Sequence, residues 1–140
     1  MTVLNPPDFI SFSDVDLLRA LVASERRPNL LVDCPKGLST GLLKQLTMLC
    51  TPAYHECRIP GPLDLPDHDD RTIRTLLLHD VSRLALNQQL TMSDWLRYRA
   101  GHIQVVSITT QPLIHLVREG QFLEGLFYRL NTISITAMGR

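Results

Sequence analysis

Apolar positions along the chain gather in short runs separated by turn residues. A short apolar run between turn residues is typical of a buried strand. The sequence predicts five such strands, at residues 29–33, 53–59, 75–81, 103–109 and 131–138. We expect the strands that start near Asn29, Thr75 and Ile103 to be central, because each is apolar on both faces.

Helical spacing of apolar residues marks the segments between the strands. Ser13 and Asp16 resemble a capping box at the start of an apolar stripe over 14–25, and leucines recur at helical spacing from Leu42. Further helices are predicted at 88–99 and within "EGQFLEGLFYRLN", residues 119–131. Strands that alternate with helices imply parallel pairing through right-handed crossovers. The pattern therefore predicts an α/β fold with a mostly parallel sheet of about five strands.

Composition narrows the class of protein. The chain has 140 residues, 44% of them hydrophobic, which suits one domain with a real core. It carries 14 Lys and Arg against 14 Asp and Glu, so we expect no direct DNA binding. The absence of a long apolar run and of a signal-peptide pattern predicts a cytoplasmic protein without membrane contact. Cys34, Cys50 and Cys57 are odd in number and are predicted to be reduced thiols.

Two groups of side chains contain residue types that bind metals. Asp67, His68, Asp69 and Asp70 lie in one connection, and His55 lies two residues before Cys57. A solvated acidic loop explains the first group, and strand alternation explains the second. Neither group has a partner pair at the spacing of zinc ligands, so the sequence predicts no metal site. No base is placed beside a particular thiol, so no Cys–His nucleophilic site is predicted either.

The segment near the C-terminus points to a family. "GQFLEGLFYRLN", with the upstream "VVSITTQPLIHLV", resembles the final part of the central domain of sigma-54-dependent transcription activators, which are bacterial enhancer-binding proteins of the AAA+ ATPase class. The matching positions follow the family pattern without a gap: Leu113, Leu116, Val117, Gly120, Phe122, Glu124, Leu126, Tyr128, Arg129, Leu130, Asn131 and Ile135.

Upstream segments resemble other parts of the same domain. "RTLLLHDVSRLALNQQ" resembles the Walker B strand and its helix, and "HEC" resembles the "VNC" that ends the family's second strand. The matching residues near Walker B are Thr75, Leu76, Leu78, Leu84, Leu86 and Gln89. The resemblance covers most of the chain and implies a P-loop NTPase-like (AAA+) three-layer sandwich with a mostly parallel five-stranded sheet.

The positions of nucleotide chemistry depart from the family pattern. Where the family has the phosphate loop "GESGTGKE", this chain has "CPKGLSTG", residues 34–41. Gly37 remains, but Cys34 and Ser39 replace glycines and Thr40 replaces the lysine that reaches the β and γ phosphates. The segment is therefore interpreted as an ordinary turn between a strand and a helix.

The remaining catalytic positions are also substituted. His79 and Asp80 stand where the Walker B pair should be two carboxylates, and Thr110 replaces the sensor asparagine. Of the two family arginines that reach across the subunit boundary, Leu123 replaces the first and Arg129 matches the second. A histidine at position 79 is a softer ligand than the hard oxygen anion that Mg²⁺ prefers. We therefore expect no ATPase activity and no cofactor.

Larger parts of the family pattern are missing as well. The sigma-contacting insertion with its "GAFTGA" loop is replaced by the short connection "PGPLDLPDHDD", residues 60–70, which is predicted to be exposed and irregular. The sequence shows neither the helical lid nor the helix-turn-helix that follow in the family. We expect residues 1–140 to form a single degenerate AAA+ core.

These observations predict a non-catalytic domain that acts by contact with a protein partner, namely a sigma-54 activator, another AAA+ subunit or a second copy of itself. Glu124 and Arg129 lie off the apolar stripe of their helix and are the predicted interface residues. An internal salt bridge is the competing explanation for both. Two other hypotheses remain: a residual ATPase that binds ATP and Mg²⁺, and a fragment of a longer regulator or a relic without activity.

Overall fold

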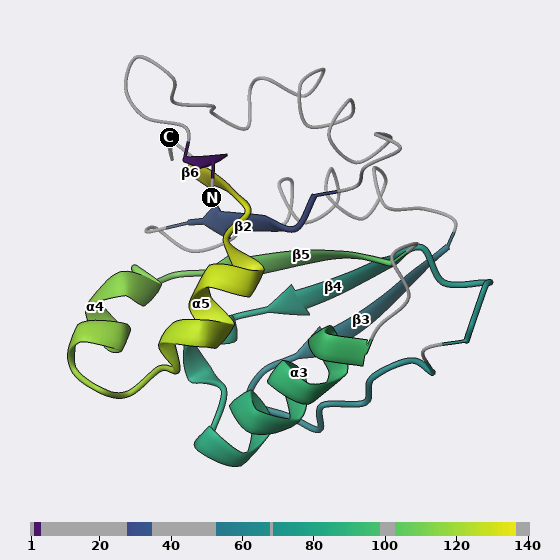
Figure 1. Cartoon of the computed structure of the whole chain (residues 1–140), viewed down its shortest axis with the longest axis horizontal. Coiled ribbons are helices and arrows are strands. Elements are labelled where there is room, and N and C mark those ends of the chain that lie inside the picture. Colours follow the sequence, from purple (N-terminus) through teal and green to yellow (C-terminus); the bar gives the residue numbers. More distant parts are fainter. Residues whose placement is uncertain (1, 4–27, 35–52, 68, 99–102, 137–140) are drawn as a thin grey trace.

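The computed structural model describes residues 2–3, 28–34, 53–67, 69–98 and 103–136. Its centre is a sheet of six parallel strands in the order β1-β6-β2-β5-β4-β3 (Figure 1). The strands are β1 (Thr2–Val3), β2 (Leu30–Asp33), β3 (Tyr54–Arg58), β4 (Thr75–His79), β5 (Gln104–Thr109) and β6 (Ile133–Thr136).

The sheet confirms the sequence prediction. All five predicted strands are present, and every described pairing is parallel. β1, which has two residues, is a sixth strand that the sequence did not predict. β2, β5 and β4 occupy the middle of the order, as expected from their apolar faces. All residues of β4 and β5 are buried, which is the condition of strands covered on both sides.

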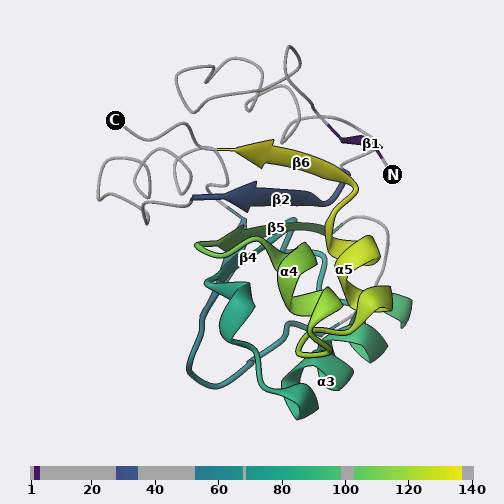
Figure 2. The same ribbon diagram turned by 90° about the vertical axis from the view of Figure 1, so that its left-hand side faces the viewer.

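Three helices and one 3₁₀ turn are described, and the three helices lie on the same face of the sheet (Figure 2). The 3₁₀ turn is η1 (Val81–Arg83), and the helices are α3 (Leu86–Tyr98), α4 (Leu113–Arg118) and α5 (Glu124–Leu130). Their apolar sides form one core with the sheet, in which Met92, Leu126 and Leu130 are almost fully buried. The predicted helices at 14–25 and from Leu42 lie outside the described residues.

The segment 119–131 is helical only from Glu124. Gly120 has a φ of 75°, a conformation that a glycine adopts without strain and that ends the preceding α4. Phe122 is buried in the turn that follows, before α5 begins. The helical spacing of Phe122 with Leu126 therefore reflects a shared core position.

The connection after β3 is irregular, as predicted, but it is not simply exposed. Leu63 and Leu65 pack against the core, and two side chains of α3 donate hydrogen bonds to its backbone. Nε1 of Trp95 lies 2.8 Å from the carbonyl oxygen of Pro66, and Nε2 of Gln88 lies 2.9 Å from that of Gly61. The prediction missed that this polar segment has alternate leucines that turn inward and fasten it to α3.

Candidate functional site

The carboxyl ends of the parallel strands meet at one edge of the sheet, and four of the predicted nucleotide-site positions lie at this edge. Cys34 follows β2, Thr110 follows β5, and His79 ends β4 with Asp80 directly after it. Open α/β sheets bind ligands at this edge. We call these four residues, with Asp33, Glu56 and Arg58 at the ends of β2 and β3, the carboxyl-edge cluster. Gly37, Ser39 and Thr40 lie outside the described residues.

His79 is held by a carboxylate on the neighbouring strand. Its Nε2 lies 2.7 Å from Oε2 of Glu56 on β3, in a hydrogen bond that the imidazole N–H donates to the carboxylate. The other oxygen of Glu56 lies 3.5 Å from Nη2 of Arg58, two residues further on the same strand. The side chain of His79 is only 11% exposed, so this bond is largely shielded from water. His79 is therefore tied to a partner within the protein.

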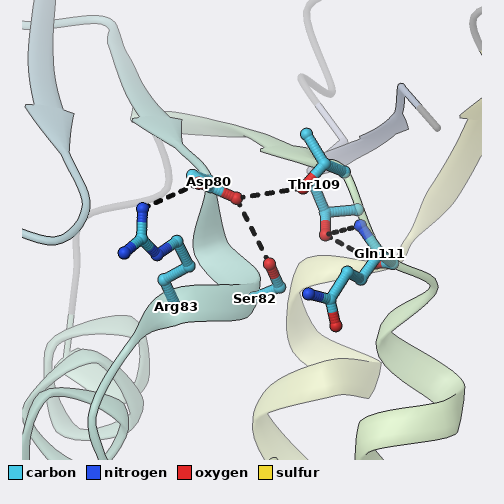
Figure 3. A network of polar contacts seen from close by, with 6 residues as sticks. Asp80, Ser82, Arg83, Thr109 and Gln111 are labelled. Atoms are coloured by element: carbon cyan, nitrogen blue, oxygen red, sulfur yellow. Dashed lines mark hydrogen bonds and ion pairs between the residues drawn. The ribbon is translucent and has the colours of Figure 1, made fainter. Parts of the chain in front are cut away.

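Asp80 directs its carboxylate into a turn. Its backbone is left-handed, with φ 62° and ψ 51°, a conformation that aspartate tolerates better than most residues. Oδ1 accepts hydrogen bonds from Ser82 at 3.2 Å and Thr110 at 3.4 Å, and Oδ2 lies 3.9 Å from Nη1 of Arg83 (Figure 3). Both carboxylate oxygens of Asp80 thus have partners inside the domain.

The end of β5 is fixed by local hydrogen bonds. Oγ1 of Thr109 donates to the carbonyl oxygen of Gln111 at 2.6 Å and accepts from its N–H at 3.2 Å (Figure 3). The carbonyl oxygen of Thr109 accepts from the N–H of Cys34 at 2.7 Å. These bonds join the ends of β2 and β5 and hold Thr110 beside Asp80.

Asp33 and Cys34 lie in a poorly hydrated part of the edge. Burial raises the pKa of Asp33, and Oδ1 of this residue has no hydrogen-bond partner in the described part of the chain. Burial, with a smaller effect from the negative charge of Asp33, raises the pKa of Cys34 to about 11. Cys34 is 1% exposed, so it is an unreactive buried thiol.

The described residues of the carboxyl-edge cluster fit a magnesium-bound nucleotide poorly. Mg²⁺ requires oxygen ligands in near-octahedral geometry, usually one or two carboxylates with water and phosphate oxygens. At this edge the imidazole of His79 is bound to Glu56, and the carboxylate of Asp80 is bound to two hydroxyls and lies near a guanidinium. His79 offers no oxygen ligand, and only Oδ2 of Asp80 accepts no described hydrogen bond, so these two positions offer fewer oxygen ligands than a pair of carboxylates would.

The second pair of predicted residues lies apart from this edge, on α5. Glu124 and Arg129 are both exposed. Nη1 of Arg129 donates to the carbonyl oxygen of Ser93 on α3 at 3.3 Å. Among the described residues no ion pair joins Glu124 to Arg129, so an internal salt bridge between the two does not account for them.

The sequence did not reveal the role of Gln89, which the family match included without assigning a function. Its side chain is buried in α3 and lies 2% exposed. Nε2 donates to the carbonyl oxygens of Leu84 at 3.0 Å and Gln121 at 3.1 Å, while Oε1 accepts from the N–H of Leu123 at 2.8 Å. Gln89 therefore anchors the turn before α5 and sets where that helix begins.

Asn29 has a similar role at the other end of α5. The sequence places it only at the start of the predicted strand 29–33. Nδ2 donates to the carbonyl oxygen of Arg129 at 2.8 Å, and Oδ1 accepts from the N–H of Val105 at 3.0 Å. The available signal in the sequence was a polar amide directly before an apolar run.

The residue types considered for metal binding do not converge in the described chain. No group of three or more His, Cys, Asp or Glu side chains there is arranged to hold an ion. His55 and Cys57 both contact the carbonyl oxygen of Asp64, which fastens the connection to β3. No described helix is long and apolar enough to cross a membrane.

Comparison of the fold with solved structures shows the class of domain. The ATP complex of NtrX from Brucella abortus superposes with a TM-score of 0.65 at 15% identity, over 93% of this chain and 38% of that one. A second structure of NtrX from Brucella abortus gives a TM-score of 0.65 at 14% identity, over 91% of this chain and 37% of that one. A RuvB mutant from Thermotoga maritima gives 0.53 at 17% identity, over 93% and 47%. The chain therefore has the parallel α/β fold of these structures and spans less than half the length of these proteins.

The family follows from the sequence. Residues 24–138 match the sequence profile of the sigma-54 interaction domain, and the chain belongs to this family. No curated protein sequence matches this chain.

Proposed function

We propose that this sigma-54 interaction domain does not hydrolyse ATP and acts by contact with an AAA+ partner in a bacterial sigma-54 regulatory system. The observation that carries the first half is the bond between His79 and Glu56. In the resemblance His79 stands at the magnesium-site aspartate, and Glu56 stands at the asparagine of the family's "VNC". The carboxylate is thus on β3 instead of β4, where it accepts a hydrogen bond from the imidazole of His79 and lies 3.5 Å from the guanidinium of Arg58.

Phosphoryl transfer depends almost wholly on positioning and on stabilising charge. At the Walker B positions only Asp80 carries a carboxylate, so one of the two groups that hold Mg²⁺ and orient the attacking water is missing. Thr40 in place of the lysine and Thr110 in place of the sensor asparagine would weaken the same contacts. NtrX has been solved with ATP, and residual ATP binding without hydrolysis is the second candidate for this chain.

The second half of the proposal rests on α5. Glu124 and Arg129 retain the family residues, are exposed, and have no ion pair with each other among the described residues. Packing does not require either charge. The proposed partner is a sigma-54 activator or another AAA+ subunit in the cytoplasm, and we propose no direct contact with DNA.

Titration of the purified chain with Mg-ATP in a calorimeter tests the first half. We expect no phosphate release and at best weak binding of the nucleotide. Phosphate release would overturn the first half, and micromolar affinity without phosphate release would favour the second candidate. Mixing with a sigma-54 activator from the same cell tests the second half. We expect co-elution and a lower ATPase rate of the activator, both lost in Arg129→Glu and kept in the matched exposed variant Arg71→Glu.

A further inference from the structure

Strand β1 covers only one half of the outer edge of β6. It runs parallel to β6, level with Ile133 and Ser134, and lies beside it in both views (Figure 1, Figure 2). On the other side, β2 pairs with all four residues of β6. Ile135 and Thr136 therefore have no pairing partner on the outer side among the described residues.

The outer edge of β6 presents backbone hydrogen-bonding groups. The N–H of Ile133 donates to the carbonyl oxygen of Asn29 at 3.1 Å, so the backbone groups of Ile133 point toward β2. Successive residues of a strand point their backbone groups to opposite sides. The N–H and C=O of Ser134 and Thr136 therefore point outward, and Thr136 lies beyond the part of β6 that β1 pairs with. Without β1, this edge is a template for the pairing of another strand.

The side chains of β1 match those of β6 poorly. Residues paired in a parallel sheet direct their side chains to the same face. A threonine, Thr2, lies beside Ile133. Val3 lies beside Ser134, so the alternation of apolar and polar residues in β1 is out of phase with that in β6. Ile135, which is 0% exposed, has no residue of β1 beside it.

The short length of β1 also limits how firmly it binds. It has two residues, and the conformational entropy lost in ordering a residue is comparable with the net gain from one hydrogen bond. Pro6 and Pro7 follow closely in the sequence and have no N–H to donate to a sheet. A longer strand whose alternation is in phase with β6 would therefore bind this edge better than β1 does.

We propose that the outer edge of β6 accepts an extended segment of a partner protein, which displaces β1 and runs parallel to β6. Segment residues level with Ile133 and Ile135 direct their N–H and C=O at β6, because they alternate with the outward groups of Ser134 and Thr136. These residues are apolar, since they share a face with the two isoleucines. The residue beside Ser134 is small or carries a hydroxyl.

This mode of binding is the addition of a strand to a sheet. Main-chain hydrogen bonds supply its affinity, and the alternate side chains supply its specificity. The partner is thus defined as a segment in which apolar residues alternate with hydroxyl residues. The inference goes beyond the proposed contact of α5 and does not depend on it, because the site is an edge of the sheet.

Fluorescence anisotropy on the full chain tests the added strand. The probe is a labelled peptide in which isoleucines alternate with threonines between terminal lysines, and we expect saturable binding. Methylation of the isoleucine nitrogens should abolish binding, because those N–H groups face β6. Methylation of the threonine nitrogens, which face away, should change the affinity by less than about threefold. An unmethylated peptide that fails to bind, or binding that survives isoleucine methylation, would overturn the proposal.

The double variant Val3→Cys/Ser134→Cys tests whether β1 occupies the same edge. Val3 and Ser134 are paired, and neighbouring strands lie about 4.8 Å apart, within the Cα separation that a disulfide spans. We expect the oxidised chain to bind the peptide at least about tenfold more weakly than the reduced chain, because β1 can no longer leave. Val3→Cys alone, oxidised in the same way, should bind as the wild type does. Equal affinity of the oxidised and reduced double variant, or a disulfide that joins two chains, would show that β1 is not the displaced strand.

Discussion

Nε2 of His79 and Oε2 of Glu56 lie 2.7 Å apart across the neighbouring strands β4 and β3. The parallel register sets His79 opposite Arg58 and Leu77 opposite Glu56, so the two side chains reach toward each other from staggered positions. The bond joins the middle of β3 to the end of β4, and no other described hydrogen bond joins side chains of these two strands.

The first prediction concerns this bond. Glu56→Leu leaves the mostly buried imidazole of His79 without its acceptor, so we expect the free energy of unfolding to fall by about 1–2 kcal/mol. Glu56→Gln keeps an acceptor of similar shape and should cost clearly less. Urea unfolding followed by tryptophan fluorescence measures both variants, with the exposed Glu119→Gln as the control. Equal stability of the leucine variant and the wild type would contradict a structural role for the pair.

The second prediction concerns Gln89. Gln89→Leu removes the partners of two carbonyl oxygens and one N–H in the turn before α5, at Leu84, Gln121 and Leu123. Because the site is buried, we expect a loss of about 2–3 kcal/mol of unfolding free energy. Gln121→Leu changes an exposed side chain whose backbone carbonyl is retained, and it should have little effect. Hydrogen exchange should also rise at Leu123 in Gln89→Leu, and unchanged protection there would exclude the anchoring role.

The third prediction compares two glycines. Gly125→Ala should raise the free energy of unfolding by about 0.5–1 kcal/mol, because alanine restricts the unfolded chain and its Cβ meets no described atom within 4 Å. Gly120→Ala should lower it by about 1–2 kcal/mol, because its φ of 75° strains any residue with a Cβ. Thermal melts of both variants test the pair. The two substitutions should change the free energy of unfolding in opposite directions. A loss of stability in both variants would show that the fold itself requires glycine at position 125.

The fourth prediction concerns Cys34. With its pKa raised to about 11, the thiol is almost entirely protonated at pH 8, so alkylation by iodoacetamide should be at least about a hundredfold slower than in the unfolded chain. The rate should keep rising with pH up to about 11. Asp33→Asn removes the negative charge that disfavours the thiolate, so it should lower the pKa of Cys34 and increase the rate at pH 9.

Peptide mass analysis assigns the modified cysteine, and Cys50→Ser removes a competing thiol in the control. The same pKa has a consequence for stability. The unfolded chain loses its thiol proton from about pH 9 and the folded chain only near pH 11, so stability should decline over that window. A fully reactive Cys34 at pH 8 would contradict its burial.

The strands were predictable because a buried parallel strand is apolar on both faces and therefore reads as a continuous run. "TLLLHDV" and "IQVVSIT" have no competing interpretation as amphipathic elements, and both became central strands. The start of α5 was less predictable. Phe122 keeps the helical spacing of the core residues, yet it lies in a turn that Gly120 and the hydrogen bonds of Gln89 determine.

The sequence by itself determined the family, the parallel α/β fold and the positions where nucleotide chemistry is substituted, because hydrophobic periodicity and motif spacing are properties of the chain. Only the tertiary structure decided what the substituted residues do. Glu56 and His79 are 23 residues apart, and nothing in the spacing pairs them before β3 and β4 lie side by side in register. Burial, hydrogen-bond partners and exposed faces depend on contacts between distant segments, and those contacts exist only in the folded sheet and its helices.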